Sequence, residues 1–335
     1  MGWVREKMPS PPTFSHGRER ECGSACGETN MLLCDEYLTP KTLDEAFAAM
    51  DQHRGRFKLV AGATDIFPWA REGRAGDVEI PVLIDVASIP ELNERKIDDK
   101  QARFGAATKL QRFLDDPQLA RVLPCMPRCA VWFACDQLRE SATIGGNIVN
   151  ASPAGDGIPP LVAHKAELEI AARSNGKISI RREPLIDFIK GPGKTTLADN
   201  EILTAIVCES LPGYGGSFEK VGHRRSLVIS TVCLATLVKL DAVGKRFEDV
   251  RLAIGGIGPV PQRLAEVEQF LLSGAIDQER LEQAAEMPVK LVQSRSRQEY
   301  RREVVRGFVM RGLINAVRRA GGGAVVTPEL EASYA

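Results

Sequence analysis

Apolar positions recur along the first part of the chain with two different periods. In TPKTLDEAFAAM the side chains of Leu43, Phe47 and Met50 fall on one helical face, which predicts a helix. Thr42 followed by Glu45 is typical of the N-terminus of such a helix. Short apolar runs predict three strands, at residues 57–62, 81–86 and 102–108.

The middle of the chain mixes both periods. The segment LARVLPCMPRCAVWFAC, residues 119–135, follows a helical pattern that Pro124 and Pro127 interrupt, and another helix is expected after GIPP. In AELEIAARSNGKISIR two alternating runs flank Asn175 and Gly176, and this arrangement predicts a β-hairpin.

The last third of the chain predicts a domain of antiparallel sheet plus helices at residues 214–322. Long apolar runs predict two strands, at 230–242 and 247–258, and helical patterns follow at 263–272, 277–292 and 297–320. The last helical segment carries one apolar stripe: Val304, Val305, Phe308, Gly312, Leu313, Ala316 and Ala320. Residues 1–30, rich in Pro, Gly, Ser and charge, and residues 323–335 are expected to be tails.

Length and charge narrow the class of protein. A chain of 335 residues can form two or three domains. Its 44 basic and 44 acidic side chains give no net attraction to nucleic acid or to an anionic membrane. No apolar run approaches the roughly 20 residues that cross a bilayer, and no secretory signal is visible at the N-terminus. We therefore expect a cytoplasmic protein that binds neither nucleic acid nor membrane.

The eight cysteines fit a reducing compartment, so disulfides are not expected. Cys22, Cys26 and Cys34 cluster, but without CxxC spacing. Cys125 and Cys129 lie four residues apart in a helical pattern, which favours burial as small apolar side chains. No metal site is assigned.

Two glycine-bearing turns resemble nucleotide-binding motifs only in part. GPGKT at 191–195 lacks the first glycine of a P-loop, because position 188 is Phe188. GGIGPVP at 255–261 lacks the third glycine of a dinucleotide fingerprint and continues into prolines. Both are interpreted as ordinary turns.

A different pair of turns suggests an anion site. LVAGATD at 59–65 and TIGGN at 143–147 each place small residues beside an apolar segment, where backbone N–H groups are expected to be exposed. Two such turns could hold one pyrophosphate between them. Taken singly, each is more typical of a structural turn.

Together with three later motifs, these turns resemble a known family. LVAGATD, ATIGGNIVNASPAGDGIPPLVAHKAELEI, GPGKTTLADNEILTAI, FEKVGHRRSLVISTV and RLAIGGIGPVPQRLAEVE occur in the order seen in FAD-binding subunits of molybdenum hydroxylases, the xanthine dehydrogenase and carbon monoxide dehydrogenase group. The resemblance covers residues 35–321. It implies an α+β, two-lobed FAD-binding fold of the vanillyl-alcohol-oxidase (PCMH) type at 31–213, with lobes at about 31–90 and 91–213, followed by a smaller C-terminal α+β domain.

The same resemblance implies cofactor-binding residues, and it implies no catalytic residue in this chain. The FAD-binding positions are Leu59, Val60, Ala61, Gly62, Ala63, Thr64, Asp65, Ile66, Phe133, Thr143, Ile144, Gly145, Gly146, Asn147, Asp156, Leu203 and Lys220. The residues alone leave alternatives open for three of them. Asp156 could cap the following helix, Phe133 could be a core side chain, and Lys220 could be a solvated surface charge.

By resemblance, the chain is an electron-transfer subunit. Electrons would leave a molybdopterin-bound molybdenum centre on a large partner subunit, pass two [2Fe–2S] clusters on a small partner, and reach FAD here before NAD+ or another acceptor. One alternative is a free-standing FAD-dependent oxidoreductase of the same fold, and another is a scaffold subunit without FAD.

The chain departs from the family pattern at one position of the first turn, where Ala63 replaces a glycine common in the family. No cysteine insertion separates the two turns, so no iron–sulfur cluster is expected in this chain.

Overall fold

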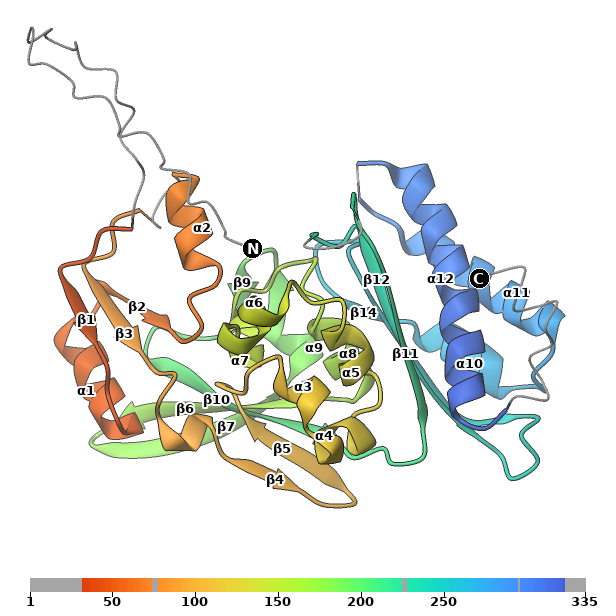
Figure 1. Cartoon of the computed structure of the whole chain (residues 1–335), viewed down its shortest axis with the longest axis horizontal. Helices are drawn as coiled ribbons and strands as arrows, with labels where there is room; N and C mark the ends of the chain where they lie inside the picture. The colour runs from red at the N-terminus through yellow and green to blue at the C-terminus, as the bar shows by residue number, and fades with distance from the viewer. Residues whose placement is uncertain (1–31, 74–77, 225–227, 295, 323–335) are drawn as a thin grey trace, which may run out of the picture.

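The structure is a computed structural model that describes residues 32–73, 78–224, 228–294 and 296–322. The predicted tails, with Cys22 and Cys26, lie outside the described residues. Three larger sheets follow one another across the molecule in Figure 1, and helices fill the space between the second and third.

The first sheet is parallel and has the strand order β1-β3-β2. Its strands are β1 (Glu36–Leu38), β2 (Phe57–Val60) and β3 (Val82–Asp85). The predicted first helix is confirmed as α1 (Leu43–Gln52), whose apolar face is buried against β3. Its N-terminus is also as predicted, because Thr42 Oγ1 accepts a hydrogen bond from the Glu45 N–H at 3.1 Å.

The second sheet is antiparallel, with the order β4-β5-β10-β6-β7. Its strands are β4 (Arg95–Ile97), β5 (Gln101–Gly105), β6 (Glu167–Ser174), β7 (Lys177–Pro184) and β10 (Glu201–Glu209). The predicted hairpin is confirmed as β6–β7. Asn175 and Gly176 both adopt positive φ at its turn, +50° and +71°.

Short helices cover this second sheet (Figure 1). They are η1 (Pro90–Leu92), α3 (Arg112–Asp115), α4 (Pro117–Val122), α5 (Met126–Ala130), α6 (Asp136–Ser141), α7 (Ile144–Val149), α8 (Ile158–Ala163) and α9 (Leu185–Phe188), whereas α2 (Ile66–Arg71) lies beside the first sheet. Pro124 separates α4 from α5, as expected. Pro127 does not interrupt a helix, because it occupies the first turn of α5, where proline is tolerated. The GPGKT segment is an ordinary turn between β8 (Ile189–Gly191) and β9 (Lys194–Thr195).

The two predicted strands and the three predicted helical segments of the C-terminal domain are present, and two further strands, β11 (Gly215–Val221) and β14 (Gln262–Arg263), were not predicted. The predicted strands are β12 (Val232–Leu240) and β13 (Phe247–Gly255), and the sheet pairs antiparallel in the order β11-β12-β13-β14. The helices are α10 (Ala265–Leu272), α11 (Gln278–Glu286), η2 (Met287–Leu291) and α12 (Gln298–Arg319). The apolar stripe of α12 packs on this sheet, and Gly312 permits close contact with Thr236.

The second sheet, with its short helices, and the third sheet share one hydrophobic core. Cys125 and Cys129 of the α5 segment are 0% and 1% exposed within it, which confirms their predicted burial. Side chains from β11, β12 and β13 complete the same core. Arg251 of β13 forms an ion pair with Glu209 of β10 at 2.7 Å, so polar contacts also join the two parts.

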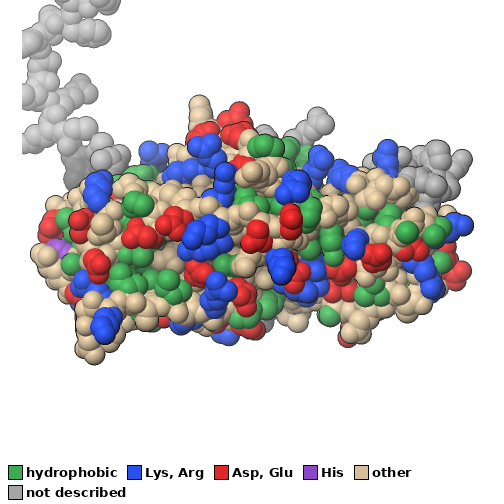
Figure 2. All heavy atoms as spheres, turned by 90° about the horizontal axis from the view of Figure 1, so that it is seen from below, with side chains coloured by type: hydrophobic (Ala, Val, Ile, Leu, Met, Phe, Trp, Pro, Cys, Tyr) green, Lys and Arg blue, Asp and Glu red, His purple; other side chains and the backbone are tan. Residues whose placement is uncertain are grey.

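Basic and acidic side chains are interspersed over the face seen in Figure 2, in keeping with the formal net charge of zero. Within the described ranges, no helix combines the length and the apolar character required to cross a bilayer.

Candidate functional site

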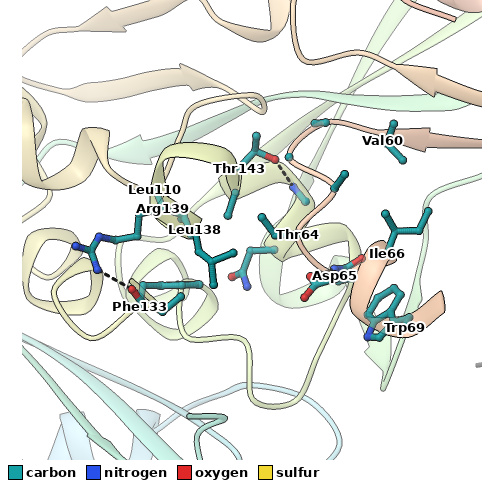
Figure 3. Close-up of a pocket in the computed structure, with 18 of the residues that line it drawn as sticks. Val60, Thr64, Asp65, Ile66, Trp69, Leu110, Phe133, Leu138, Arg139 and Thr143 are labelled. Atoms are coloured by element: carbon teal, nitrogen blue, oxygen red, sulfur yellow. Dashed lines mark hydrogen bonds between the residues drawn. The ribbon is translucent and has the colours of Figure 1, made fainter. Parts of the chain in front are cut away.

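A cleft lies where the first parallel sheet meets helices α6 and α7. All eight residues from Leu59 to Ile66 line it, together with Phe133, Thr143, Gly146 and Asn147. Figure 3 shows Val60, Asp65 and Ile66 on one side and Phe133, Leu138 and Thr143 on the other. The empty space in the cleft, its open mouth included, is about 920 Å³. This is the size of a site for a small molecule or cofactor.

The first loop, residues 61–65, presents free backbone donors to the cleft. It connects the end of β2 at Val60 to the start of α2 at Ile66. The backbone N–H groups of residues 61–64 donate to no other residue that the structure describes. Ala63 adopts φ +52°, and such a left-handed residue curves successive N–H groups toward one point, an anion-binding arrangement.

Gly62 brings this loop against the segment that precedes the second loop. A Cβ atom at position 62 would lie 2.3 Å from the carbonyl oxygen of Ser141 and 2.9 Å from Cα of Ala142. Both neighbours are backbone atoms, which cannot rotate away. The absence of a side chain at Gly62 therefore allows the two walls of the cleft to meet.

The second loop forms the first turn of α7, and here the expectation of exposed N–H groups is wrong. Ile144 N–H donates to Thr108 O at 3.0 Å and Gly145 N–H donates to Ala106 O at 2.9 Å. Gly146 N–H donates to Thr143 Oγ1, which caps the helix, at 3.1 Å. Thr143 thus acts as an N-cap, a role that the TIGGN motif could have indicated because threonine precedes the helical residues.

The two glycines of this loop have different surroundings. A Cβ atom at Gly145 would lie 2.6 Å from Ala106 O, so this glycine is needed for packing against the chain. At Gly146 a Cβ atom would meet only Thr143 Oγ1, at 3.1 Å, and the glycine faces the cleft. Beside it, Asn147 Oδ1 is buried and has no hydrogen-bond partner among the described residues. This oxygen lies against Gly157, where a Cβ atom would be only 2.8 Å from it.

A side-chain hydrogen bond also crosses the cleft. Asn150, at the end of α7, donates from its amide nitrogen to Asp65 Oδ2 at the start of α2. An adjoining cavity shares Leu59, Val60 and Ala61 with the cleft and reaches Gly145 and Leu203. The predicted Leu203 is therefore next to the cleft, on β10.

The sequence left two roles open for Phe133, a cofactor contact and a core side chain, and the position of its ring is compatible with both. Its side chain packs against the large core and also lines the cleft. The residue lies between α5 and α6, followed by Ala134 at φ +40°. The ring therefore closes one wall of the cleft in Figure 3.

Asp156 and Lys220 form a buried ion pair that does not line the cleft. Lys220 Nζ lies 2.6 Å from Asp156 Oδ2 and donates to Trp132 O at 3.2 Å. The two side chains are only 5% and 8% exposed, so a solvated surface charge at Lys220 is excluded. Burial raises the pKa of Asp156 above its usual range, and Lys220 opposes this effect. The alternative role of Asp156 as a helix cap is also wrong, because Gly157 is the N-cap of α8.

Several residues of the site were not predicted from the sequence. They are Lys58, Trp69, Leu110, Leu138, Arg139 and Asn150 in the cleft, and Ser230, which donates to Asp156 Oδ1. Asn150 could have been found from its position one turn after Asn147 on α7. Ser230 could not, because it contacts the site only through the packing of β12 against the α8 region.

The chain is similar to known proteins over most of its length. A family model described as "FAD binding domain in molybdopterin dehydrogenase" matches residues 30–208, and one described as "CO dehydrogenase flavoprotein C-terminal domain" matches residues 217–316. A putative xanthine dehydrogenase FAD-binding subunit of Escherichia coli K12 is 30% identical over 272 residues, covering 79% of this chain and 90% of the relative. The nicotinate dehydrogenase FAD-subunit of Eubacterium barkeri is 24% identical, over 86% of this chain and 98% of that subunit.

A solved structure has the same fold. A chain of carbon monoxide dehydrogenase from Hydrogenophaga pseudoflava superimposes with a TM-score of 0.78 at 24% identity, covering 86% of this chain and 99% of that chain. The predicted α+β, two-lobed FAD-binding fold with a C-terminal domain is thereby confirmed. Because the first family model spans more than half of the sequence, this chain is an oxidoreductase subunit that belongs to the family of FAD-binding subunits of the molybdenum hydroxylases.

Proposed function

We propose that this chain is the electron-transfer subunit of a multi-subunit molybdenum hydroxylase. It takes electrons from [2Fe–2S] clusters on a small partner subunit, supplied by a molybdopterin-bound molybdenum centre on a large partner, and passes them to NAD+ or another acceptor. FAD, when bound, exchanges electrons with one-electron and two-electron carriers. The observation that supports this role is the cleft in which both predicted loops meet.

We further propose a cytoplasmic location, FAD-binding lobes at about 31–90 and 91–213, and a C-terminal domain at 214–322.

The residues of the cleft fit FAD. Residues 61–64 offer backbone N–H groups around the left-handed Ala63, as a pyrophosphate requires. Gly146 leaves open space on the opposite wall, which Asn147 also lines. The adjoining cavity extends the cleft along mostly apolar side chains, including Leu203.

Each part of the site would then have its own task. The first loop binds the pyrophosphate, and Thr143 holds the second loop in a helical turn so that Gly146 and Asn147 face the cofactor. Ile144 and Gly145 support this turn from behind through hydrogen bonds to residues 106 and 108. Phe133 shields the cofactor from water on one side. Asp156 and Lys220 act from behind Phe133, through the Trp132 carbonyl and through their charges.

The experiment that tests this function is reconstitution with partners. The chain is co-expressed with its large and small partner subunits, and the purified complex is examined for FAD, iron, molybdenum and substrate-dependent reduction of NAD+. A complex that contains all three and loses NAD+ reduction when this chain is omitted would support the proposal. Turnover of an organic substrate by this chain alone would instead identify a free-standing flavin oxidoreductase.

A further inference from the structure

The loop between α5 and α6, residues 131–135 and here named the Phe133 loop, has few side-chain anchors. Val131 is 60% exposed and Trp132 is 50% exposed, so their burial contributes little to the position of the loop. Ala134 adopts φ +40°, a conformation that alanine rarely takes without support from its surroundings. Packing of the Phe133 ring on the core and hydrogen bonds from the N–H groups of residues 131–133 to α5 hold one side of the loop. The carbonyl groups of the loop are held separately.

Two cations hold the backbone of this loop. Lys220 Nζ donates to the carbonyl oxygen of Trp132 at 3.2 Å, and Arg139 Nη1 donates to the carbonyl oxygen of Phe133 at 2.8 Å. Successive carbonyl groups are therefore fixed by side chains from different elements, β11 and α6. Hydrogen bonds from charged donors are among the stronger ones in proteins.

Arg139 is itself held in place. Its residue is 7% exposed, and its Nε donates to Gln111 Oε1 at 2.9 Å while Nη2 forms an ion pair with Asp136. The backbone also joins these segments, because Gln111 N–H donates to Arg139 O at 3.2 Å. Leu110 and Leu138, the neighbours of Gln111 and Arg139, both line the cleft. Arg139 thus connects three lining segments, and its guanidinium points toward the Phe133 backbone in Figure 3.

We propose that Arg139 is a positioning residue that fixes Phe133 against the cofactor. This inference rests on the proposed function, since it requires FAD in the cleft. Without the guanidinium, the Phe133 loop would lose one of its two charged anchors, and the ring would sample several positions. FAD would then bind more weakly, in an altered environment, while the fold of the lobe is retained.

The test compares Arg139→Gln and Arg139→Lys in the full chain. Each is stripped of flavin, titrated with FAD and examined for the shape of its flavin absorbance bands. Arg139→Gln should raise the Kd for FAD about tenfold or more, as expected for loss of a hydrogen bond from a charged donor, and should shift the bands. Arg139→Lys should recover part of both changes. Arg319→Gln is the matched control, because Arg319 donates to the Gly216 carbonyl at 2.9 Å and does not line the cleft.

A double variant separates positioning from a general structural role. If Arg139 acts through Phe133, then Arg139→Gln should have little further effect on FAD binding in a Phe133→Ala background. Wild-type Kd and bands in Arg139→Gln would overturn the inference, and so would an undiminished effect in that background or a fall in Tm of the flavin-free chain beyond that of the control. If the wild-type chain bound no FAD, the proposed function itself would fail.

Discussion

Gly62 packs so closely on Ser141 that a Cβ atom at position 62 would lie 2.3 Å from the Ser141 carbonyl oxygen. The two residues are far apart in the sequence, and their contact joins the first loop to the segment leading into α7. The shape of the cleft therefore depends on a missing side chain as much as on the residues that face it.

Gly62→Ala should separate the two walls of the cleft. A methyl group against backbone atoms costs about 1–3 kcal/mol, and relief of the clash moves the first loop. We expect FAD affinity to fall about tenfold or more, as measured by titration of the flavin-free chain. Gly307→Ala is the control, because no atom of the described residues outside the adjoining helix backbone lies within 4 Å of a Cβ there, and alanine favours the helix. Equal FAD affinity in Gly62→Ala and the wild type would show that the contact does not shape the site.

The neighbouring glycines of the second loop should respond differently. Gly145→Ala places its methyl group against Ala106 and should lower the free energy of unfolding of the flavin-free chain by about 1–3 kcal/mol. Gly146→Ala has space in the flavin-free chain but intrudes on the cofactor side, so it should weaken FAD binding with little change in stability. Urea unfolding and FAD titration of both variants distinguish the two cases. The reverse pattern would contradict our assignment of Gly145 to packing and Gly146 to binding.

Loss of Lys220 should destabilise the chain through its buried partner. Lys220→Met leaves Asp156 buried without its cation, which costs about 3–5 kcal/mol at neutral pH. Because burial already raises the pKa of Asp156, its protonation should recover part of this loss as the pH falls. The double variant Lys220→Met, Asp156→Asn should be more stable than Lys220→Met at pH 7 by urea unfolding. Strict additivity of the two substitutions would show that the pair is not coupled.

His164 should make the stability depend on pH. It is fully buried, and burial lowers its pKa from 6.5 to about 3. Between pH 6.5 and about pH 3 the unfolded chain binds a proton at His164 that the folded chain does not bind. The contribution of the neutral His164 to the free energy of unfolding is therefore complete above pH 6.5 and is lost as the pH falls. The stability advantage over His164→Gln should shrink by about 1.4 kcal/mol per pH unit below 6.5. Urea unfolding at pH 7.5 and 5.5 measures this, with His53→Gln as the control. A constant difference would mean that His164 titrates normally in the fold.

Local patterns in the sequence predicted the longer helices and about half of the strands, whereas β1, β4, β10, β11 and most short helices were not predicted. The capped helix α1, the Asn175-Gly176 hairpin and the stripe of α12 all follow from contacts within a few residues. The role of Pro127 was misjudged because a proline can either interrupt a helix or lie in its first turn. The break at Pro124 starts a new helix, and Pro127 falls in the first turn of that helix.

The site could be predicted only in part, because its distinctive contacts are long-range. The exposed amides of residues 61–64 agree with the small-residue pattern. The amides of the second loop do not agree with that pattern, because the carbonyl groups of residues 106 and 108 accept hydrogen bonds from the N–H groups of Gly145 and Ile144. The buried partners of Lys220 and the anchoring role of Arg139 depend on tertiary packing that no local spacing encodes.

The most direct test of the central claim is an FAD titration of the purified, flavin-free chain. We predict saturable binding of one FAD per chain, with the absorbance bands of oxidised flavin, release on denaturation, and marked weakening in Gly62→Ala and Gly146→Ala. A wild-type chain that binds no FAD, or binding unaffected by both substitutions, would contradict the assignment of this cleft as the flavin site.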